Sequence, residues 1–231
     1  MNTVIILGII IVLGITLLAV LINYGNKYMA SNDVINGVYP GDDLIAKKDQ
    51  VLFFAKEIDI DAPAAIVWKH VAQQGQKKAG FYSFELLERL LTFKIRNTYN
   101  IVPEWSELKT GEWIYYHQMG IGSGIMEVEE GKYFTMLSDT RKPPINNGKA
   151  FALRAIPGGD FAWTWNFHVT SIEENRSKLV QRCHCYFSPN NLFTRGYIKF
   201  FLGIPSIVMT TRQMFVLKAC AEGRFPKQQV N

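Results

Sequence analysis

An uncharged run of twenty residues, residues 3–22 (TVIILGIIIVLGITLLAVLI), stands near the start of the chain. As a helix it would span about 30 Å, the thickness of the hydrocarbon core of a bilayer. A core helix of a globular protein is amphipathic, whereas this run is apolar all round. A cleaved signal peptide has a basic start, a shorter apolar run and a small-residue cleavage site, and this sequence shows none clearly. We therefore expect residues 1–24 to form a retained single-pass transmembrane helix.

The basic residues beside this run predict its orientation. Lys27, Lys47 and Lys48 follow the run, and no lysine or arginine precedes it. Positive charge favours the cytoplasmic side, so the rest of the chain is expected in the cytoplasm, held at the cell membrane. Residues 25–50 contain glycines and a proline, which favour turns, and are interpreted as a juxtamembrane tether.

The chain has 231 residues and a formal net charge of +5, which favours an anionic partner. About 180 residues remain after the apolar run, enough for one domain with its own core. Basic residues crowd the end of the chain, where the one acid after residue 175 is Glu222. Because no helix-turn-helix, zinc finger or RNA-recognition motif is visible, we expect a membrane surface as partner and no nucleic acid.

Three cysteines, Cys183, Cys185 and Cys220, argue against a disulfide framework. Their number is odd, and two residues at positions i and i+2 of a strand lie too far apart for an ordinary disulfide. Free thiols favour a reducing compartment. Strand alternation also directs His184 away from Cys183 and Cys185, so neither a metal site nor another cofactor is expected.

The order of patterns predicts an α+β domain over residues 51–231. A strand at Val51–Asp61 is followed by two helices. The first begins at Ala62-Pro63, and the second covers Tyr82–Leu91. Helices at Leu192–Leu202 and Pro205–Glu222 close the chain, with a break at Gly203–Pro205. The strands expected between them are Glu112–His117, Ser123–Glu130, Tyr133–Ser138, Ala150–Ile156, Phe161–Ile172 and Leu179–Phe187.

The last two predicted strands form a hairpin with one apolar and one polar face. A turn near Asn175 pairs Trp165 with Cys185 and Phe167 with Cys183. The apolar face then carries Trp163, Trp165, Phe167, Val169, Cys183, Cys185 and Phe187. The other carries Thr164, Asn166, His168, Thr170, Arg182 and His184, and is expected to face solvent. A stripe on the last helix covers the apolar face and consists of Ile204, Val208, Thr211, Phe215 and Ala219.

Several segments resemble the SRPBCC group of START-like and polyketide cyclase/dehydrase-related proteins. They are IDIDAPAAIVWKHVAQQGQ (58–76), AGFYSFELLERLL (79–91), NTYNIVPEWSELKTGEWI (97–114) and the tail from Pro205 through Arg224. The resemblance covers residues 51–224 and does not include the apolar run. It implies a helix-grip fold, in which an antiparallel sheet wraps around a long C-terminal helix with a hydrophobic cavity between them.

Members of this group commonly bind lipids, sterols, polyketides or other apolar molecules, so a hydrophobic small molecule or lipid is the expected ligand. The residues expected to line the cavity are Phe81, Tyr82, Trp105, Trp113, Trp163, Trp165 and Phe215. A cyclase or hydrolase that uses the same cavity is one alternative. A protein-interaction module with a filled core is another. No oligomeric state follows from the sequence.

The sequence contains no recognisable catalytic set. It lacks a Gly-x-Ser-x-Gly elbow, and the glycines of residues 120–124 precede a strand, unlike those of a phosphate-binding loop. The acid–base candidates near predicted aromatic surfaces are Glu104, His117, His168 and Glu85, and we assign none of them as catalytic. The helix at Leu192–Leu202 has aromatic and basic sides and is interpreted as a lid or as an interfacial helix.

Overall fold

The computed structural model describes residues 3–90, 92–155 and 158–225, and it confirms the α+β helix-grip architecture. The helices are α1 (Thr3–Gly25), α2 (Asn32–Asn36), α3 (Ala64–Ala72), α4 (Glu85–Leu90), α5 (Leu192–Ile198) and α6 (Ile204–Ala221). The strands are β1 (Gln50–Ile60), β2 (Trp113–Tyr115), β3 (Gly122–Glu129), β4 (Tyr133–Asp139), β5 (Asp160–Thr164), β6 (Asn166–Glu173) and β7 (Arg176–Ser188). A π-helical turn, Lys199–Gly203, joins α5 to α6, so the chain stays helical through Gly203–Pro205, where a break is predicted.

The seven strands form one antiparallel sheet. Its order is β1-β7-β5-β4-β3-β2, and β6 pairs with β4 and β7. The predicted strand Phe161–Ile172 is divided at Trp165 into β5 and β6. The predicted strand Ala150–Ile156 is wrong, since Ala150 and Phe151 make isolated bridges and Ile156 lies outside the described residues. Because β4 is already paired with β3 on one side and with β5 and β6 on the other, the sheet offers this segment no free edge there.

The predicted hairpin has the correct faces but the wrong register. Asn166 pairs with Arg182 and Trp163 with Cys185, two residues away from the expected pairing. Side chains alternate along a strand, so a shift of two residues leaves every side chain on its predicted face. Trp165, Phe167 and Cys183 accordingly lie in the apolar core.

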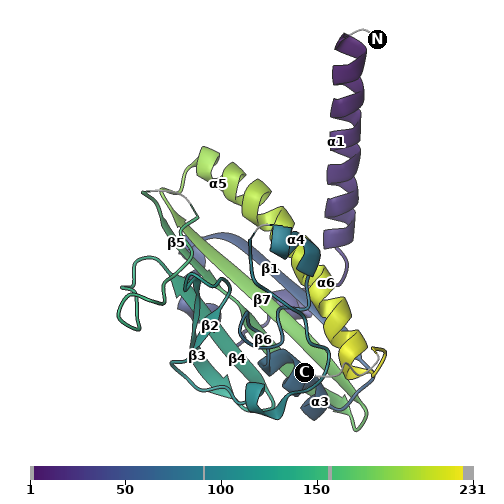
Figure 1. The fold of residues 1–231 in the computed structure, drawn as a ribbon, viewed down its shortest axis with the longest axis vertical. Helices are drawn as coiled ribbons and strands as arrows, with labels where there is room; N and C mark the ends of the chain where they lie inside the picture. Colours follow the sequence, from purple (N-terminus) through teal and green to yellow (C-terminus); the bar gives the residue numbers. More distant parts are fainter. Residues whose placement is uncertain (1–2, 91, 156–157, 226–231) are drawn as a thin grey trace.

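Helix α6 covers the apolar face of the sheet, as Figure 1 shows. Its buried side includes Thr210, Met214 and Leu217, whereas the predicted stripe is wrong at Phe215, which is 38% exposed. Helix α6 also packs against the end of α1 through Ile207. Apolar residues therefore lie on more than one side of α6, and spacing by itself does not select the side that faces the sheet.

Residues 26–50 cover the opposite face, so the expectation that it faces solvent is wrong. His168, Arg182 and His184 are all buried there. The interpreted tether is folded: residues Tyr28 and Ala30 hydrogen-bond to the backbone of β1, and the following residues cross the polar face. This pairing also covers part of the edge strand β1. Free backbone N–H and C=O groups on an edge strand could otherwise pair with a strand of another molecule and cause aggregation.

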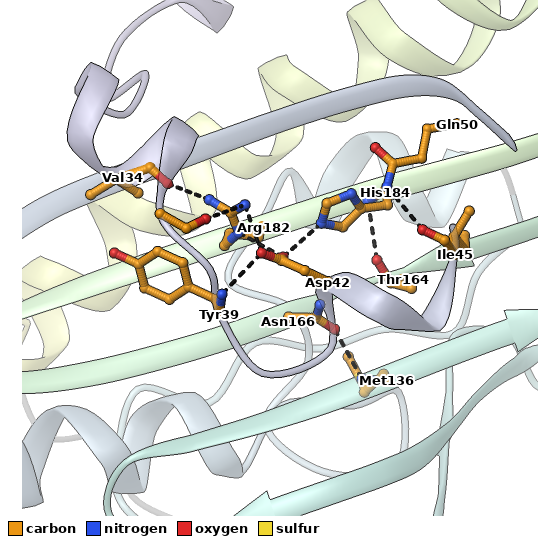
Figure 2. A network of polar contacts seen from close by, with 11 residues as sticks. Val34, Tyr39, Asp42, Ile45, Gln50, Met136, Thr164, Asn166, Arg182 and His184 are labelled. Atoms are coloured by element: carbon orange, nitrogen blue, oxygen red, sulfur yellow. Dashed lines mark hydrogen bonds and ion pairs between the residues drawn. The ribbon is translucent and has the colours of Figure 1, made fainter. Parts of the chain in front are cut away.

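An ionic network attaches this cover to β7 (Figure 2). The Asp42 carboxylate accepts hydrogen bonds from Arg182 Nε at 2.8 Å and Nη2 at 2.9 Å, and its Oδ1 lies 2.9 Å from His184 Nε2. Arg182 Nη1 also donates to the carbonyl oxygen of Val34. Burial would raise the pKa of Asp42, but the hydrogen bonds from His184 and Arg182 outweigh it and lower the pKa to about 2. The buried guanidinium thus receives both a counter-ion and backbone acceptors.

Lys56 joins α1, β1 and α6. Its buried Nζ donates to the carbonyl oxygens of Gly25 at 2.6 Å and Lys27 at 2.8 Å, and lies 2.8 Å from Thr211 Oγ1. The last carbonyls of a helix have no partner within the helix and carry partial negative charge, so an ammonium group stabilises the end of α1. Burial lowers the pKa of Lys56 to about 8.

Replacing Asp42 tests the ionic network. Asp42→Asn leaves Arg182 buried without its counter-ion, and should reduce the free energy of unfolding by about 1.5–3 kcal/mol at pH 7. Ionised Asp42 stabilises the fold above pH 3.8 and loses this effect as pH falls toward 2, so the difference from wild type should shrink there. Urea denaturation of the full chain in micelles measures both effects. Equal losses in Asp42→Asn and in the exposed control Asp43→Asn would contradict the assignment.

Replacing Lys56 tests the junction at the end of α1. Lys56→Met keeps the apolar stem and removes the donor, which leaves the Gly25 and Lys27 carbonyl oxygens without it. We expect faster hydrogen exchange of the amides of residues 26–31 in the full chain, measured by mass spectrometry. Lys48→Met, at an exposed position, is the control. Unchanged exchange in Lys56→Met would mean that other contacts hold the junction.

Candidate functional site

A cavity of about 210 Å³ lies between α6, α4 and the apolar face of the sheet. Its lining is aromatic and aliphatic with a few polar groups. The lining residues are Phe81, Ser83, Glu88, Phe93, Ile95, Tyr116, Trp163, Trp165, Ser206, Met209, Thr210 and Gln213. The helix-grip arrangement creates this space because α6 crosses a curved sheet whose side chains do not fill the region beneath its first turns.

Three of the seven predicted lining residues meet in the cavity: Phe81, Trp163 and Trp165. The Phe81 and Trp165 rings stack with centroids 5.6 Å apart, and the Trp163 and Trp165 rings are 5.8 Å apart. Tyr116 completes this wall, with its hydroxyl 2.5 Å from Ser123 Oγ. Burial raises the pKa of Tyr116 to about 12, so its hydroxyl stays protonated.

The other four predicted residues lie outside the lining. Tyr82 is completely buried in the core, where its hydroxyl accepts a hydrogen bond from Gln73 Nε2 at 2.6 Å. Trp105 is half-buried against the core, and Trp113 packs over Gly124 of β3. Phe215 lies on the outer side of α6, between Arg212 and Arg224.

Sequence reasoning missed Glu88, the lining residue with an ionisable carboxyl group. The Glu88 side chain is buried, at 5% exposed, and neither carboxylate oxygen has a hydrogen-bond partner among the described residues. Burial, then the neighbouring charge of Glu85, raise the pKa of Glu88 to about 7. Ser83 Oγ and Trp165 Nε1 are also buried without a partner in the described part of the chain.

Helix α4 directs Glu88 toward the cavity because its amphipathic pattern is inverted, with the apolar side chains outside and the glutamate inside. Its leucines, Leu86, Leu87 and Leu90, are 72%, 54% and 71% exposed, while Glu88 points inward. A helix on the surface of a water-soluble domain has the opposite arrangement. A glutamate inside a leucine-rich turn is visible in the sequence, but only the structure shows that Glu88 faces the cavity.

The acid–base candidates from the sequence do not meet in the cavity. Glu104 is exposed, and Glu85 accepts a hydrogen bond from the Asn97 backbone and pairs with Arg89 at 3.6 Å. His117 is buried against Phe93, its ring centroid 4.9 Å away. His168 lies on the opposite face of the sheet, where burial lowers its pKa to about 4.

Metal binding has no support in the described part of the chain. No group of three or more His, Cys, Asp or Glu residues there is placed to hold a metal ion. Cys183 and Cys185 point into apolar clusters, whereas His184 bonds to Asp42 on the opposite face. A second hollow, of about 450 Å³, lies beside the loop 140–154, and half of its lining residues are exposed.

The solvent side of the cavity lies next to the end of α1. Met209 of the lining is 38% exposed, and Ile207, on the adjoining part of α6, contacts Gly25 so closely that an added Cβ would lie 2.7 Å from Ile207 Cγ1. The ring of Tyr24 lies 6.3 Å from that of Phe84, the residue before α4. Helix α6 and the residue that precedes α4 therefore lie against the last turn of α1.

In the part of the chain that the structure describes, two helices have the length and composition to cross a membrane. Over Ile5–Gly25 the mean hydropathy is 3.3, and none of its most apolar window is buried. The second, Leu192–Ala221, has a mean hydropathy of 1.4 and contains α6, which packs on the sheet as a core helix.

No family model matches the chain, and no curated protein sequence matches it. Solved structures with a similar chain trace include a hypothetical protein from Helicobacter pylori, 9% identical over 80% of this chain and 96% of that one, with a TM-score of 0.45. A protein from Nitrosomonas europaea is 11% identical over 76% and 97%, with a TM-score of 0.44. One from Mesorhizobium loti is 16% identical over 76% and 100%, with a TM-score of 0.41.

Removing the charge of Glu88 should stabilise the protein in a pH-dependent way. The folded-state pKa of about 7 exceeds the ordinary 4.5, so the contribution of Glu88 to stability is complete below pH 4.5 and is lost as pH rises through 7. Glu88→Gln should therefore gain melting temperature over wild type progressively between pH 4.5 and 7.5. Thermal melts of the full chain measure this, with the exposed Glu107→Gln as control. A difference that is constant with pH would contradict the buried carboxyl.

Proposed function

We propose that this protein is a membrane-anchored binding protein of the START-like SRPBCC group that holds a hydrophobic small molecule or lipid. The observation that carries the proposal is the aromatic cavity under α6, whose solvent side lies beside the end of the exposed apolar helix α1. Ligand pockets are typically apolar, with a few polar groups that orient the ligand, and this lining has that composition.

The size of the cavity limits what it binds. Pockets for drug-sized ligands have volumes of about 300–1,000 Å³, compared with about 210 Å³ here. The cavity therefore suits one small apolar molecule, or the end of a longer one that continues through the solvent side toward α1. In that second arrangement the rest of a lipid stays within reach of the bilayer.

The exposed apolar surface supports a position at the membrane. Helix α1 is apolar all round and unburied, which is unfavourable in water and favourable in a bilayer. Tyr24 and Lys27, at its end, are residue types common at the membrane–water interface. Four apolar residues of α5 and the turn after it are also exposed: Leu192, Phe193, Phe200 and Phe201. Helix α5 rises on the same side of the sheet as α1 (Figure 1). The basic residues after α1 favour a cytoplasmic domain.

The lining favours carriage over catalysis. Among the described residues around the cavity there is no histidine, cysteine, lysine or arginine. The cavity also gives less support to a protein-interaction module, since that alternative expects a filled core. Holding the cavity next to the bilayer raises the local concentration of membrane-derived ligand, which a tether achieves without any new contact.

A variant that fills the cavity tests the proposal. Ser206→Phe places a ring in the cavity from α6, and should abolish stoichiometric co-purification of an apolar molecule with the full chain, measured by native mass spectrometry and lipid extraction from nanodiscs. The control is Phe215→Ala, on the outer side of the same helix, which should keep the ligand. An empty wild-type protein that also fails to bind added apolar probes, or a Ser206→Phe protein that keeps its ligand, would contradict the proposal.

A further inference from the structure

The carboxyl group of Glu88 narrows the ligand class beyond the proposed hydrophobic molecule. The side-chain polar atoms of Glu88, Ser83 and Trp165 are buried beside the cavity and have no hydrogen-bond partner among the described residues. A pure hydrocarbon would leave these groups buried and without hydrogen bonds, which is costly above all for a carboxylate. The ligand must therefore carry a polar group that reaches Glu88.

The charges around Glu88 indicate the sign of that group. In the described residues no lysine, arginine or histidine nitrogen lies within 4.0 Å of its carboxylate, and Arg89, the next residue, pairs with Glu85. The other neighbouring charge is negative, since Glu85 also acts on Glu88. A ligand carboxylate or phosphate would meet these acids, whereas a cation would neutralise Glu88.

The number of hydrogen-bond donors points the same way. An ionised carboxylate only accepts hydrogen bonds, and its two oxygens have about four acceptor positions. A protonated primary amine offers up to three N–H donors and a compensating charge, while an alcohol offers one donor and no charge. The Ser83 hydroxyl, also in the lining, can accept a further N–H bond.

We propose that the cavity binds an amphiphile with an amine head, whose ammonium group pairs with the Glu88 carboxylate while its hydrocarbon part packs between Phe81, Trp163 and Trp165. This inference rests on the proposed binding function and adds the chemical class of the ligand. The inverted helix α4 supports it, because exposed leucines are favourable beside a bilayer and the inward glutamate would meet a head group that enters between α4 and α6.

The protonation of Glu88 gives the binding reaction a second signature. With its pKa at about 7, Glu88 is about half protonated in the free protein at neutral pH. An ammonium group beside it favours the ionised form, so amine binding releases a fraction of a proton to solvent. An alcohol does not produce this release, because it carries no charge to the site.

Three probes with the same chain length test the inference: octylamine, 1-octanol and octanoate. Full-length protein in zwitterionic nanodiscs is titrated at pH 7, and the change in tryptophan fluorescence, to which Trp163 and Trp165 of the lining contribute, reports binding. Signals from empty nanodiscs are subtracted. We expect octylamine to bind roughly tenfold or more tightly than 1-octanol, because of its charge-assisted hydrogen bonds, and octanoate to bind least. Calorimetry in two buffers of different ionisation enthalpy measures the proton release.

Variants connect the preference to the carboxylate. Glu88→Gln should bring the ratio of octylamine to 1-octanol affinity close to one, and Glu88→Asp, which keeps the charge, should retain part of the preference. Phe215→Ala, remote from the cavity, should behave as wild type, and thermal melts check that each variant is folded.

The outcomes separate this inference from the proposed function. If octylamine and 1-octanol bind equally, if octanoate binds best, or if Glu88→Gln keeps the preference, the amine class is wrong and the apolar cavity stands. If none of the three probes binds, the cavity itself is not a binding site, and the proposed function fails with it.

Discussion

Strand β7, next to the edge strand β1, is buried on both faces, and the arrangement of the rest of the molecule follows from how each face is covered. Its apolar face carries Cys183 and Cys185 into the core beneath α6. Its polar face carries Arg182 and His184, which would be costly to bury without hydrogen-bond partners. The Asp42 carboxylate is the partner of both side chains. Helix α6 covers one side of the sheet and residues 26–50 cover the other. The C-terminal end of α1, which contacts α6 and leads directly into residues 26–50, therefore has a defined position.

The position of this end of α1 determines where the cavity lies relative to the helix. The chain leaves α1 at Gly25, where Lys56 and Thr211 bind the last carbonyls, and then turns at once onto the outer face of the sheet. Because the same junction contacts α6, the apolar helix ends beside the solvent side of the cavity. If α1 is anchored as proposed, the distance between bilayer and cavity is set by these hydrogen bonds and does not depend on a flexible linker.

Within the cavity, the aromatic wall and Glu88 have different physical roles. Phe81, Trp163 and Trp165 provide apolar surface whose contribution grows with the area that a ligand covers. Glu88 contributes little area, but its unpartnered carboxyl group would discriminate among head groups in the proposed complex, since burying the wrong partner against it is costly. Pockets for small apolar molecules commonly combine an apolar wall, which provides affinity, with a few polar groups, which provide selectivity.

The sequence alone determined the α+β class, most strand and helix positions, the faces of the β6–β7 hairpin and three cavity residues, Phe81, Trp163 and Trp165. These follow from short-range periodicity, which survives even a register shift of two residues. Only the tertiary structure decided the cover over the polar face, the side of α6 that meets the sheet and the inward position of Glu88. Each depends on contacts between segments far apart in the chain, such as Asp42 with Arg182, and no local pattern encodes them.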